Sequence, residues 1–167
     1  MGNCFCFNNK LEECTFDNTP TYSLNGQRLA CKILKIYDGD TLWLAIKIHG
    51  KYYKYKCRMY GYDSPEMKPP LKQKDRDDEI KRAHEAKDYL AKLMDEKYIE
   101  AEFFGYCKYG RPLVNLYASK IRMRLCGMNL RLDNNFILIN KEMIESKHGY
   151  EYFGGTKEKV SEEIINE

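Results

Sequence analysis

The chain of 167 residues lacks any long apolar stretch. No apolar run approaches the roughly 20 residues that a membrane-spanning helix needs, so we expect no transmembrane segment. The N-terminus also lacks the basic start and apolar core of a secretory signal. We therefore predict an intracellular protein, either cytosolic or attached to the cytosolic face of a membrane.

Paired cysteines are missing as well. The count is odd, and no CxxC pair or zinc-ribbon spacing occurs. The seven cysteines are Cys4, Cys6, Cys14, Cys31, Cys57, Cys107 and Cys126. This pattern argues against a disulfide framework or a cysteine-built zinc site, and we predict that the internal cysteines are reduced core thiols. No internal repeat is visible, which leaves a single non-repetitive domain as the simplest architecture.

The composition is that of a soluble globular protein, with 43% hydrophobic and 32% charged residues. The length suits one domain with a single core. A net charge of +3 permits contact with a polyanion without requiring it. The 14 tyrosines suit half-buried strands and also surfaces that stack on nucleic-acid bases.

The first residues carry a pattern of their own. Gly2 follows the initiator methionine, and Cys4 and Cys6 come close behind. This resembles a start for N-myristoylation with nearby palmitoylation sites, although Cys6 replaces the usual Ser or Thr. Two acyl chains hold a protein stably on a membrane, whereas one does not. Two interpretations stay open: a peripheral membrane anchor, or an ordinary disordered terminus with chance cysteines.

Hydrophobic periodicity divides the chain into three parts. Residues 1–26 show no clear periodicity and are expected to form a flexible arm outside the core. From residue 27 to 157 we predict one domain, and residues 158–167 form a charged tail. Residues 28–36 alternate as a strand, and residues 42–48 form a second strand with one strongly apolar face.

The rest of the domain mixes strands and helices. A third strand is predicted at 52–60, a helix at 79–96, and two more strands at 99–103 and 112–117. Residues 120–139 favour an extra hairpin, and Asn140 is expected to cap a short second helix. The chain is therefore predicted to be mostly β with α, as a five-stranded OB-type Greek-key barrel with packed helices.

Three short polar segments lie at the predicted strand ends: residues 38–41 (DGDT), 58–66 (RMYGYDSPE) and 108–111 (KYGR). Asp40 and Asp63 offer the carboxylate oxygens that a hard cation such as calcium prefers. Asp38 could hold a metal-bound water, although an aspartate that bonds its own backbone in a plain turn is the alternative.

The same segments carry two arginines and a further carboxylate. Arg58 and Arg111 present planar forks that match phosphate oxygens, although a surface salt bridge is the usual fate of an arginine. Glu66 lies three residues beyond Asp63, across a proline, where a carboxylate could orient or deprotonate a water. A solvated turn residue is the alternative for Glu66. The combination of carboxylates and guanidinium groups suits a phosphodiester substrate.

Taken together, these segments resemble the three motifs of the staphylococcal nuclease-like (thermonuclease) family. Residues 36–42 (IYDGDTL) match its first motif, and residues 58–66 match its second with the same offsets from the arginine. Residues 108–113 (KYGRPL) match its third. The helix between the last two motifs carries the expected Glu-Ala-Lys at 85–87, and residues 140–155 are similar to its closing segment. The resemblance covers residues 28–157.

The resemblance implies an OB barrel with helices and a calcium-dependent endonuclease that cleaves DNA and RNA to 3′-phosphate ends, preferably where strands are unpaired. It assigns calcium binding to Asp40, Asp63 and the Ser64 carbonyl, and water activation to Glu66. The two remaining assignments are phosphate stabilisation by Arg58 and Arg111, and a nucleotide pocket lined by Lys108 and Tyr109. It indicates no obligate protein partner.

Some positions depart from the family pattern. Ser64 replaces the usual threonine, and Cys107 replaces an acidic residue before the third motif. Residues 120–139 do not follow the usual helical connection; a lid, a partner surface and a longer hairpin are the possibilities, and we favour the hairpin. Tyr150 and Tyr152 could stack on bases, although a buried structural role is favoured. The rival function is an OB module that binds nucleic acid or protein without catalysis, but the retained acidic residues and arginines favour the enzyme.

Overall fold

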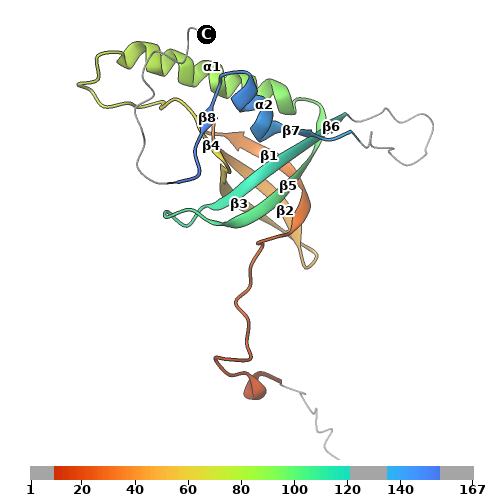
Figure 1. Cartoon of the computed structure of the whole chain (residues 1–167). Helices are drawn as coiled ribbons and strands as arrows, with labels where there is room; N and C mark the ends of the chain where they lie inside the picture. Colours follow the sequence, from red (N-terminus) through yellow and green to blue (C-terminus); the bar gives the residue numbers. More distant parts are fainter. Residues whose placement is uncertain (1–9, 121–134, 155–167) are drawn as a thin grey trace, which may run out of the picture.

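The computed structural model describes residues 10–120 and 135–154. Five strands close into a mixed barrel in the order β3-β2-β1-β5-β6, because β3 also pairs in parallel with β6. The barrel strands are β1 (Arg28–Ile36), β2 (Thr41–Ile48), β3 (Lys51–Met59), β5 (Lys97–Tyr106) and β6 (Pro112–Lys120). The predicted fold class, a mostly β OB-type barrel with packed helices, is confirmed (Figure 1).

The smaller elements decorate this barrel. An extra strand, β7 (Ile137–Leu138), pairs antiparallel with β6. Two short strands, β4 (Tyr62–Asp63) and β8 (Tyr150–Glu151), pair with each other beside the barrel. The antiparallel β6–β7 pair fits the predicted hairpin over 120–139, but residues 121–134 lie outside the described part of the chain.

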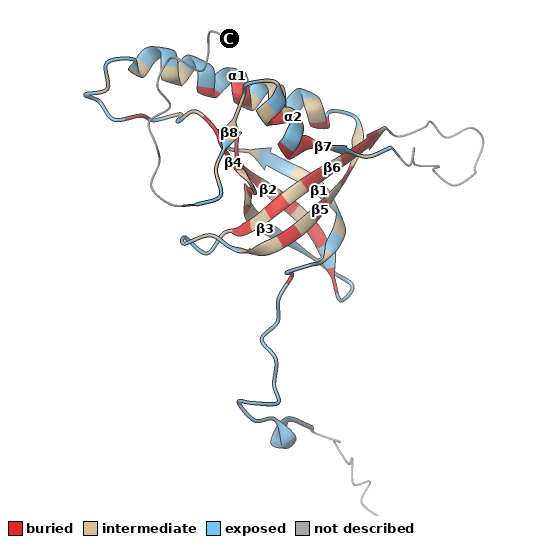
Figure 2. Ribbon diagram, viewed as in Figure 1, coloured by how far each residue is buried: buried red, intermediate tan, exposed pale blue. Residues whose placement is uncertain are grey.

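Strand β2 shows why the barrel forms. Leu42, Leu44 and Ile46 point inward and are at most 1% exposed, whereas Trp43 and Lys47 between them point outward. Side chains alternate between the two faces of a strand, so this period-two pattern fixes which face enters the core. Figure 2 shows the alternation of buried and more exposed residues along the barrel strands.

Two helices lie over one end of the barrel (Figure 1). Helix α1 (Arg76–Met94) buries the predicted apolar stripe, including Ala83, Ala86 and Leu90. None of the described helices is long and apolar enough to cross a membrane. The small side chains of the stripe let the helix approach the barrel closely.

Helix α2 (Ile139–Glu145) corrects one prediction. Asn140 does not cap it; the N-cap position is Leu138, and no side-chain cap is present. The buried Asn140 amide instead donates to the carbonyl oxygens of Tyr60 and Val114, and its Oδ1 accepts from the Leu116 N–H at 2.9 Å. Because these backbone groups are far away in the sequence, local capping rules could not reveal them.

The N-terminal arm also differs in one respect from the prediction. Residues 11–23 are exposed, and the 3₁₀ helix η1 (Lys10–Glu13) stands away from the barrel, at the end opposite the helices (Figures 1 and 2). Leu24, however, is only 3% exposed and belongs to the core. The prediction that the whole of 1–26 lies outside the core is therefore wrong at Leu24, an isolated apolar residue without a periodic pattern around it.

Candidate active site

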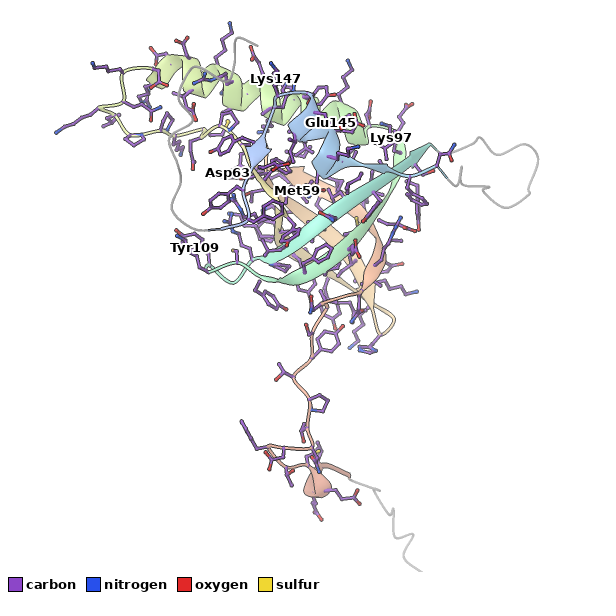
Figure 3. The ribbon with its side chains drawn as sticks, in the orientation of Figure 1. Met59, Asp63, Lys97, Tyr109, Glu145 and Lys147 are labelled. Atoms are coloured by element: carbon purple, nitrogen blue, oxygen red, sulfur yellow. The ribbon has the colours of Figure 1, made fainter. Side chains whose placement is uncertain are left out.

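The three polar motifs meet at one pocket of about 590 Å³. Its walls come from the β1–β2 turn, the segment from the end of β3 through β4, the β5–β6 turn and the segment after β8. All eight residues predicted from the motifs line it: Asp40, Arg58, Asp63, Ser64, Glu66, Lys108, Tyr109 and Arg111. Figure 3 shows Asp63 and Tyr109 on the same side of the barrel. Gly2, Cys4 and Cys6, the predicted lipidation sites, lie outside the described residues.

Asp40 reaches the pocket through a tight turn between β1 and β2. Asp38 accepts a hydrogen bond from the Asp40 N–H at 3.1 Å, which is the plain-turn role that the sequence left open for it. Gly39 is required here because a Cβ atom would lie 2.8 Å from the Cβ of Ser64. Asp40 itself is 4% exposed, and its Oδ1 accepts a 2.7 Å hydrogen bond from the Thr41 hydroxyl.

Arg58 lies between the two candidate metal ligands. Its Nη1 is 3.0 Å from Asp40 Oδ2, and its Nη2 is 2.5 Å from Asp63 Oδ1. The register places Arg58 directly opposite Thr41, so the β2–β3 pairing itself brings the arginine to the first motif. The guanidinium thus holds both carboxylates at the end of β3, as a fork can and a lysine cannot.

Burial and charge shift the pKa values of Asp40 and Arg58. Burial, aided by a hydrogen bond with Asp63, raises the pKa of Asp40 well above its usual value, although Arg58 opposes the shift. Burial opposes the charge of Arg58, but the two aspartates more than compensate and raise its pKa. One guanidinium faces two buried carboxyl groups, so a proton or a further cation would balance their charge.

Asp63 has a partner that the motifs did not indicate. The Tyr150 hydroxyl, on β8, donates to Asp63 Oδ2 at 3.0 Å. The β4–β8 pairing places Tyr150 directly opposite Asp63. Tyr150 is half-buried rather than fully buried, and its hydroxyl is bonded to Asp63. The tyrosine signal was present in the sequence, but the register needed to interpret it was not.

Glu66 lies on the loop that leaves β4. It is exposed at the pocket, and its backbone N–H donates to Glu79 Oε1 of helix α1 at 2.9 Å. The helix thereby fixes the loop that presents the Glu66 carboxylate. An exposed carboxylate at the mouth of a pocket can reach both a water and a bound substrate.

The third motif forms the turn between β5 and β6. Arg111 donates to the Thr41 hydroxyl at 3.1 Å, which links this turn to the first motif. Within the described residues, the buried Nε of Arg111 has no hydrogen-bond partner. Buried polar groups are normally satisfied, so this donor is available to an anionic or polar ligand or to water. Tyr109 is 71% exposed beside it, with its ring 5.6 Å from the Arg111 guanidinium carbon.

Cys107 directly precedes the third motif, Lys108–Arg111. Burial would raise the pKa of its thiol, but hydrogen bonds from the Tyr109 backbone and from Arg111 outweigh it and lower the pKa. The thiol therefore lies near a cationic group in the wall of the pocket. The expectation that internal cysteines are core thiols holds for buried Cys57, whose pKa burial raises to about 12, and not for Cys107.

No family model matches this chain, and no curated protein is significantly similar to it. The thermonuclease-like family therefore stays a prediction from the three motifs.

A hard cation fits the donor set of this pocket. Asp40 and Asp63 supply buried carboxyl groups, and burial is the largest cause of the raised pKa of Asp40. No group of three or more His, Cys, Asp or Glu side chains arranged around a metal was found in the described part of the chain. An ion would therefore take its other ligands from carbonyl oxygens, water or substrate, as calcium commonly does.

An aromatic wall completes the pocket and was largely missed by the sequence. The Tyr60 ring stacks on Phe104, with centroids 4.9 Å apart, and meets the edge of Phe153 at 5.8 Å. Tyr152 is half-buried, with its ring centroid 6.0 Å from the guanidinium carbon of Arg58. Three of these rings, Tyr60, Tyr152 and Phe153, line the cavity. The wall supplies flat apolar surface next to the charged floor.

Proposed function

We propose that this protein is a calcium-dependent endonuclease that hydrolyses phosphodiester bonds of DNA and RNA and leaves 3′-phosphate ends. The observation that carries the proposal is the convergence of three separate motifs on one pocket, where Arg58 joins Asp40 and Asp63 and where Arg111 presents a buried donor. Aromatic rings beside these charges suit the bases of an unpaired strand.

The two arginines would bind and stabilise the phosphate. A guanidinium has five N–H donors, and Arg58 uses one terminal nitrogen for each aspartate. Arg111 brings an unpaired Nε and is anchored by Thr41. Preorganised donors of this kind stabilise the negative charge that grows on the phosphate oxygens during attack.

Glu66 would orient the attacking water and accept its proton. Its exposed carboxylate lies at the pocket on a loop that Glu79 of helix α1 holds in place. Asp40, Asp63 and the carbonyl of Ser64 would hold calcium, with Tyr150 orienting the Asp63 carboxylate. Bound calcium supplies charge neutralisation and positioning of the nucleophile.

The direct test is cleavage of single-stranded DNA and RNA with calcium and with a chelator, followed by analysis of the product ends. We expect calcium-dependent cleavage to 3′-phosphates. Activity that survives the chelator, or 5′-phosphate products, would contradict the mechanism. Glu66→Gln serves as the inactive reference because the amide keeps the shape of the side chain and loses the base.

The alternative function is an inactive OB module that binds nucleic acid or protein. The ion pairs of Arg58 favour it, because they balance part of the charge of Asp40 and Asp63 without a metal ion. This module would bind single-stranded oligonucleotides or a protein equally well with and without calcium and would cleave neither DNA nor RNA. Calcium binding separates the two functions, and it can be measured in a titration monitored by circular dichroism and calorimetry.

We also propose peripheral attachment to the cytosolic face of a membrane through acyl chains on Gly2 and on Cys4 or Cys6. The Gly2-x-Cys4-x-Cys6 pattern supports it, and the exposed segment 11–23 would act as a spacer. Gly2→Ala removes the myristoylation site, so the variant should move from the membrane to the soluble fraction. The second variant replaces both cysteines, Cys4→Ser and Cys6→Ser. If both variants partition between membrane and soluble fraction as the original chain does, the anchor is excluded.

A further inference from the structure

The outer face of the β2–β3 hairpin carries a row of lysines and aromatic rings. We define this row as the lysine–aromatic face, and its members are Tyr37, Trp43, Lys47, Tyr52, Lys54 and Lys56. The register pairs Trp43 with Lys56, and Lys47 with Tyr52. Directly opposite residues, and residues two apart, point to the same side of a sheet, so five of the six share one surface, and Tyr37 meets it at the turn.

Each ring of the face lies next to a lysine. The Lys56 Nζ is 4.7 Å from the Tyr37 ring centroid, Lys54 Nζ is 5.7 Å from Trp43, and Lys47 Nζ is 5.8 Å from Tyr52. Tyr52 is 77% exposed and Tyr37 is 46% exposed. Cation–π contacts hold the ammonium groups near the rings, which places positive charge and flat apolar surface side by side.

The face joins the pocket. Arg58 belongs to the same side of β3 as Lys56 and Lys54, and Tyr37 adjoins Asp38 in the pocket wall. From Arg58 to Tyr52 the strand covers roughly 20 Å at its usual rise per residue. At the far end, the hairpin turn meets the N-terminal arm, where the rings of Tyr22 and His49 are 5.8 Å apart.

The charge of the barrel is divided between its sides. Strands β1, β2 and β3 hold eight of the 28 lysines and arginines and none of the 25 aspartates and glutamates. On the neighbouring β5, Glu100 is paired with Arg28 at 2.6 Å, and Glu102 accepts from the Tyr117 hydroxyl. A modest net charge for the whole chain therefore conceals a strongly basic surface beside the pocket.

We infer that the lysine–aromatic face is a track for single-stranded nucleic acid that leads into the pocket. Lysines would follow the phosphates, and the rings would stack on successive bases without sequence preference. This inference rests on the proposed function for its direction, since the track ends at Arg58. Lysines on β3 also discourage edge pairing, but that role needs no interleaved rings and no continuity with the pocket. An anionic membrane is the competing occupant.

The only tryptophan of the chain, Trp43, reports on the face directly. In chelator, which prevents calcium-dependent cleavage, single-stranded DNA of about 12 nucleotides, within the ~4–16 that an OB fold covers, should change Trp43 fluorescence. A dinucleotide, which fills only the pocket, should not. Absence of a response to the longer strand, or a response to phosphatidylserine vesicles in its place, would overturn the track.

Charge removal gives the second measurement. The variant Lys47→Gln, Lys54→Gln, Lys56→Gln should bind the longer strand at least tenfold more weakly and lower the salt-dependence slope by about 2, at ~0.7 per phosphate contact. The matched control is Lys81→Gln, Lys92→Gln, Lys141→Gln on the exposed faces of the helices, which removes the same charge. If the two variants lose the same affinity for the longer strand, the effect depends only on net charge, and the track is contradicted.

A variant that changes one ring gives an independent test, which remains informative if the triple lysine variant aggregates. Tyr52 is highly exposed, so Tyr52→Ala should fold normally. Loss of one stacked base should weaken binding of the longer strand about fivefold or more and leave dinucleotide binding unchanged. Unchanged affinity for the longer strand would contradict the track. If the chain proves to have no nuclease activity but these binding results hold, the track stands and only the proposed catalysis fails.

Discussion

Arginine–carboxylate pairs occur in two regions of the barrel with different surroundings. On the outer side, Arg28 meets Glu100 at 2.6 Å, with side chains 38% and 22% exposed. In the pocket, Arg58 meets Asp40 and Asp63, whose side chains are only 6% and 3% exposed. Rings of Tyr117 and Phe136 also cover Arg28, at 3.8 and 4.8 Å. The outer pair belongs to a partly exposed surface cluster, whereas the pocket triad is buried and places two carboxyl groups on one guanidinium.

The difference teaches how to tell a structural ion pair from a functional one. A surface pair contributes little to stability, since water screens it and side-chain entropy opposes it. A buried triad with two acids and one base is costly to assemble, and proteins keep such groups mainly where a ligand or a reaction uses them. The raised pKa of Asp40 and the unpaired Nε of Arg111 both lie on the pocket side.

The largest contrast should come from removing each arginine. Arg58→Ala leaves two buried carboxylates without their cation, and we expect a loss of about 3–5 kcal/mol in the free energy of unfolding. Cleavage should fall at least 10²–10³-fold because the proposed phosphate-stabilising donor is gone. Arg28→Ala, the control, should lose about 1 kcal/mol or less and keep its activity. Urea unfolding measures the stability of the two variants, and cleavage kinetics measure their activity. Equal effects of Arg58→Ala and Arg28→Ala would contradict the distinction between the pocket triad and the outer pair.

Glutamates in the two regions give the next contrast. Glu66→Gln should lower turnover about 10²–10⁴-fold, the usual contribution of a general base, with the free energy of unfolding within about 0.5 kcal/mol of the original. Glu100→Gln should leave turnover unchanged. Single-turnover cleavage with saturating calcium makes the comparison, and full activity of Glu66→Gln would exclude Glu66 from the chemistry.

These contrasts also show what the sequence could and could not reveal. The alternation in residues 42–48 is local and predicted the strand, and the resemblance of three short motifs to the thermonuclease-like family named the eight pocket residues. The roles of Asn140 and Tyr150 are not local: their hydrogen bonds reach partners 80 and 87 residues away. Leu24 likewise lies in the core, although no periodic pattern around it predicts that. Such contacts depend on register and closure of the barrel, which no window of sequence contains.

A smaller effect should follow from changing the shape of one cation while its charge is kept. Arg111→Lys retains the positive charge but loses the fork that bonds Thr41 and offers the unpaired Nε. Losing one charge-assisted hydrogen bond of about 1.5–3 kcal/mol should lower cleavage about 10–100-fold. Lys108→Arg, in the same turn, should change cleavage less than threefold. If Arg111→Lys behaves like Lys108→Arg, the geometry of the fork does not matter.

The smallest expected effect concerns stability against pH in the absence of calcium. Because the pKa of Asp40 is raised in the folded state above its ordinary value of 3.8, folding favours the protonated carboxyl. This contribution is fully present below pH 3.8 and is lost as the pH rises through the raised pKa. Burial is the largest cause of the raised pKa, and the hydrogen bond with Asp63 adds to it.

Asp40→Asn should remove that pH dependence, since the amide carries no proton to lose and still accepts from Thr41. At neutral pH the variant should be more stable than the original chain by about 1 kcal/mol, within the usual range for relieving a strained functional group, while calcium-dependent cleavage is lost. Calcium should flatten the pH dependence of the original chain, because a bound cation favours the ionised pair, and should have no such effect on Asp40→Asn. A profile that calcium leaves unchanged in both chains would mean that the two buried aspartates are held by Arg58 alone, as Glu100 is held by Arg28 on the outer side.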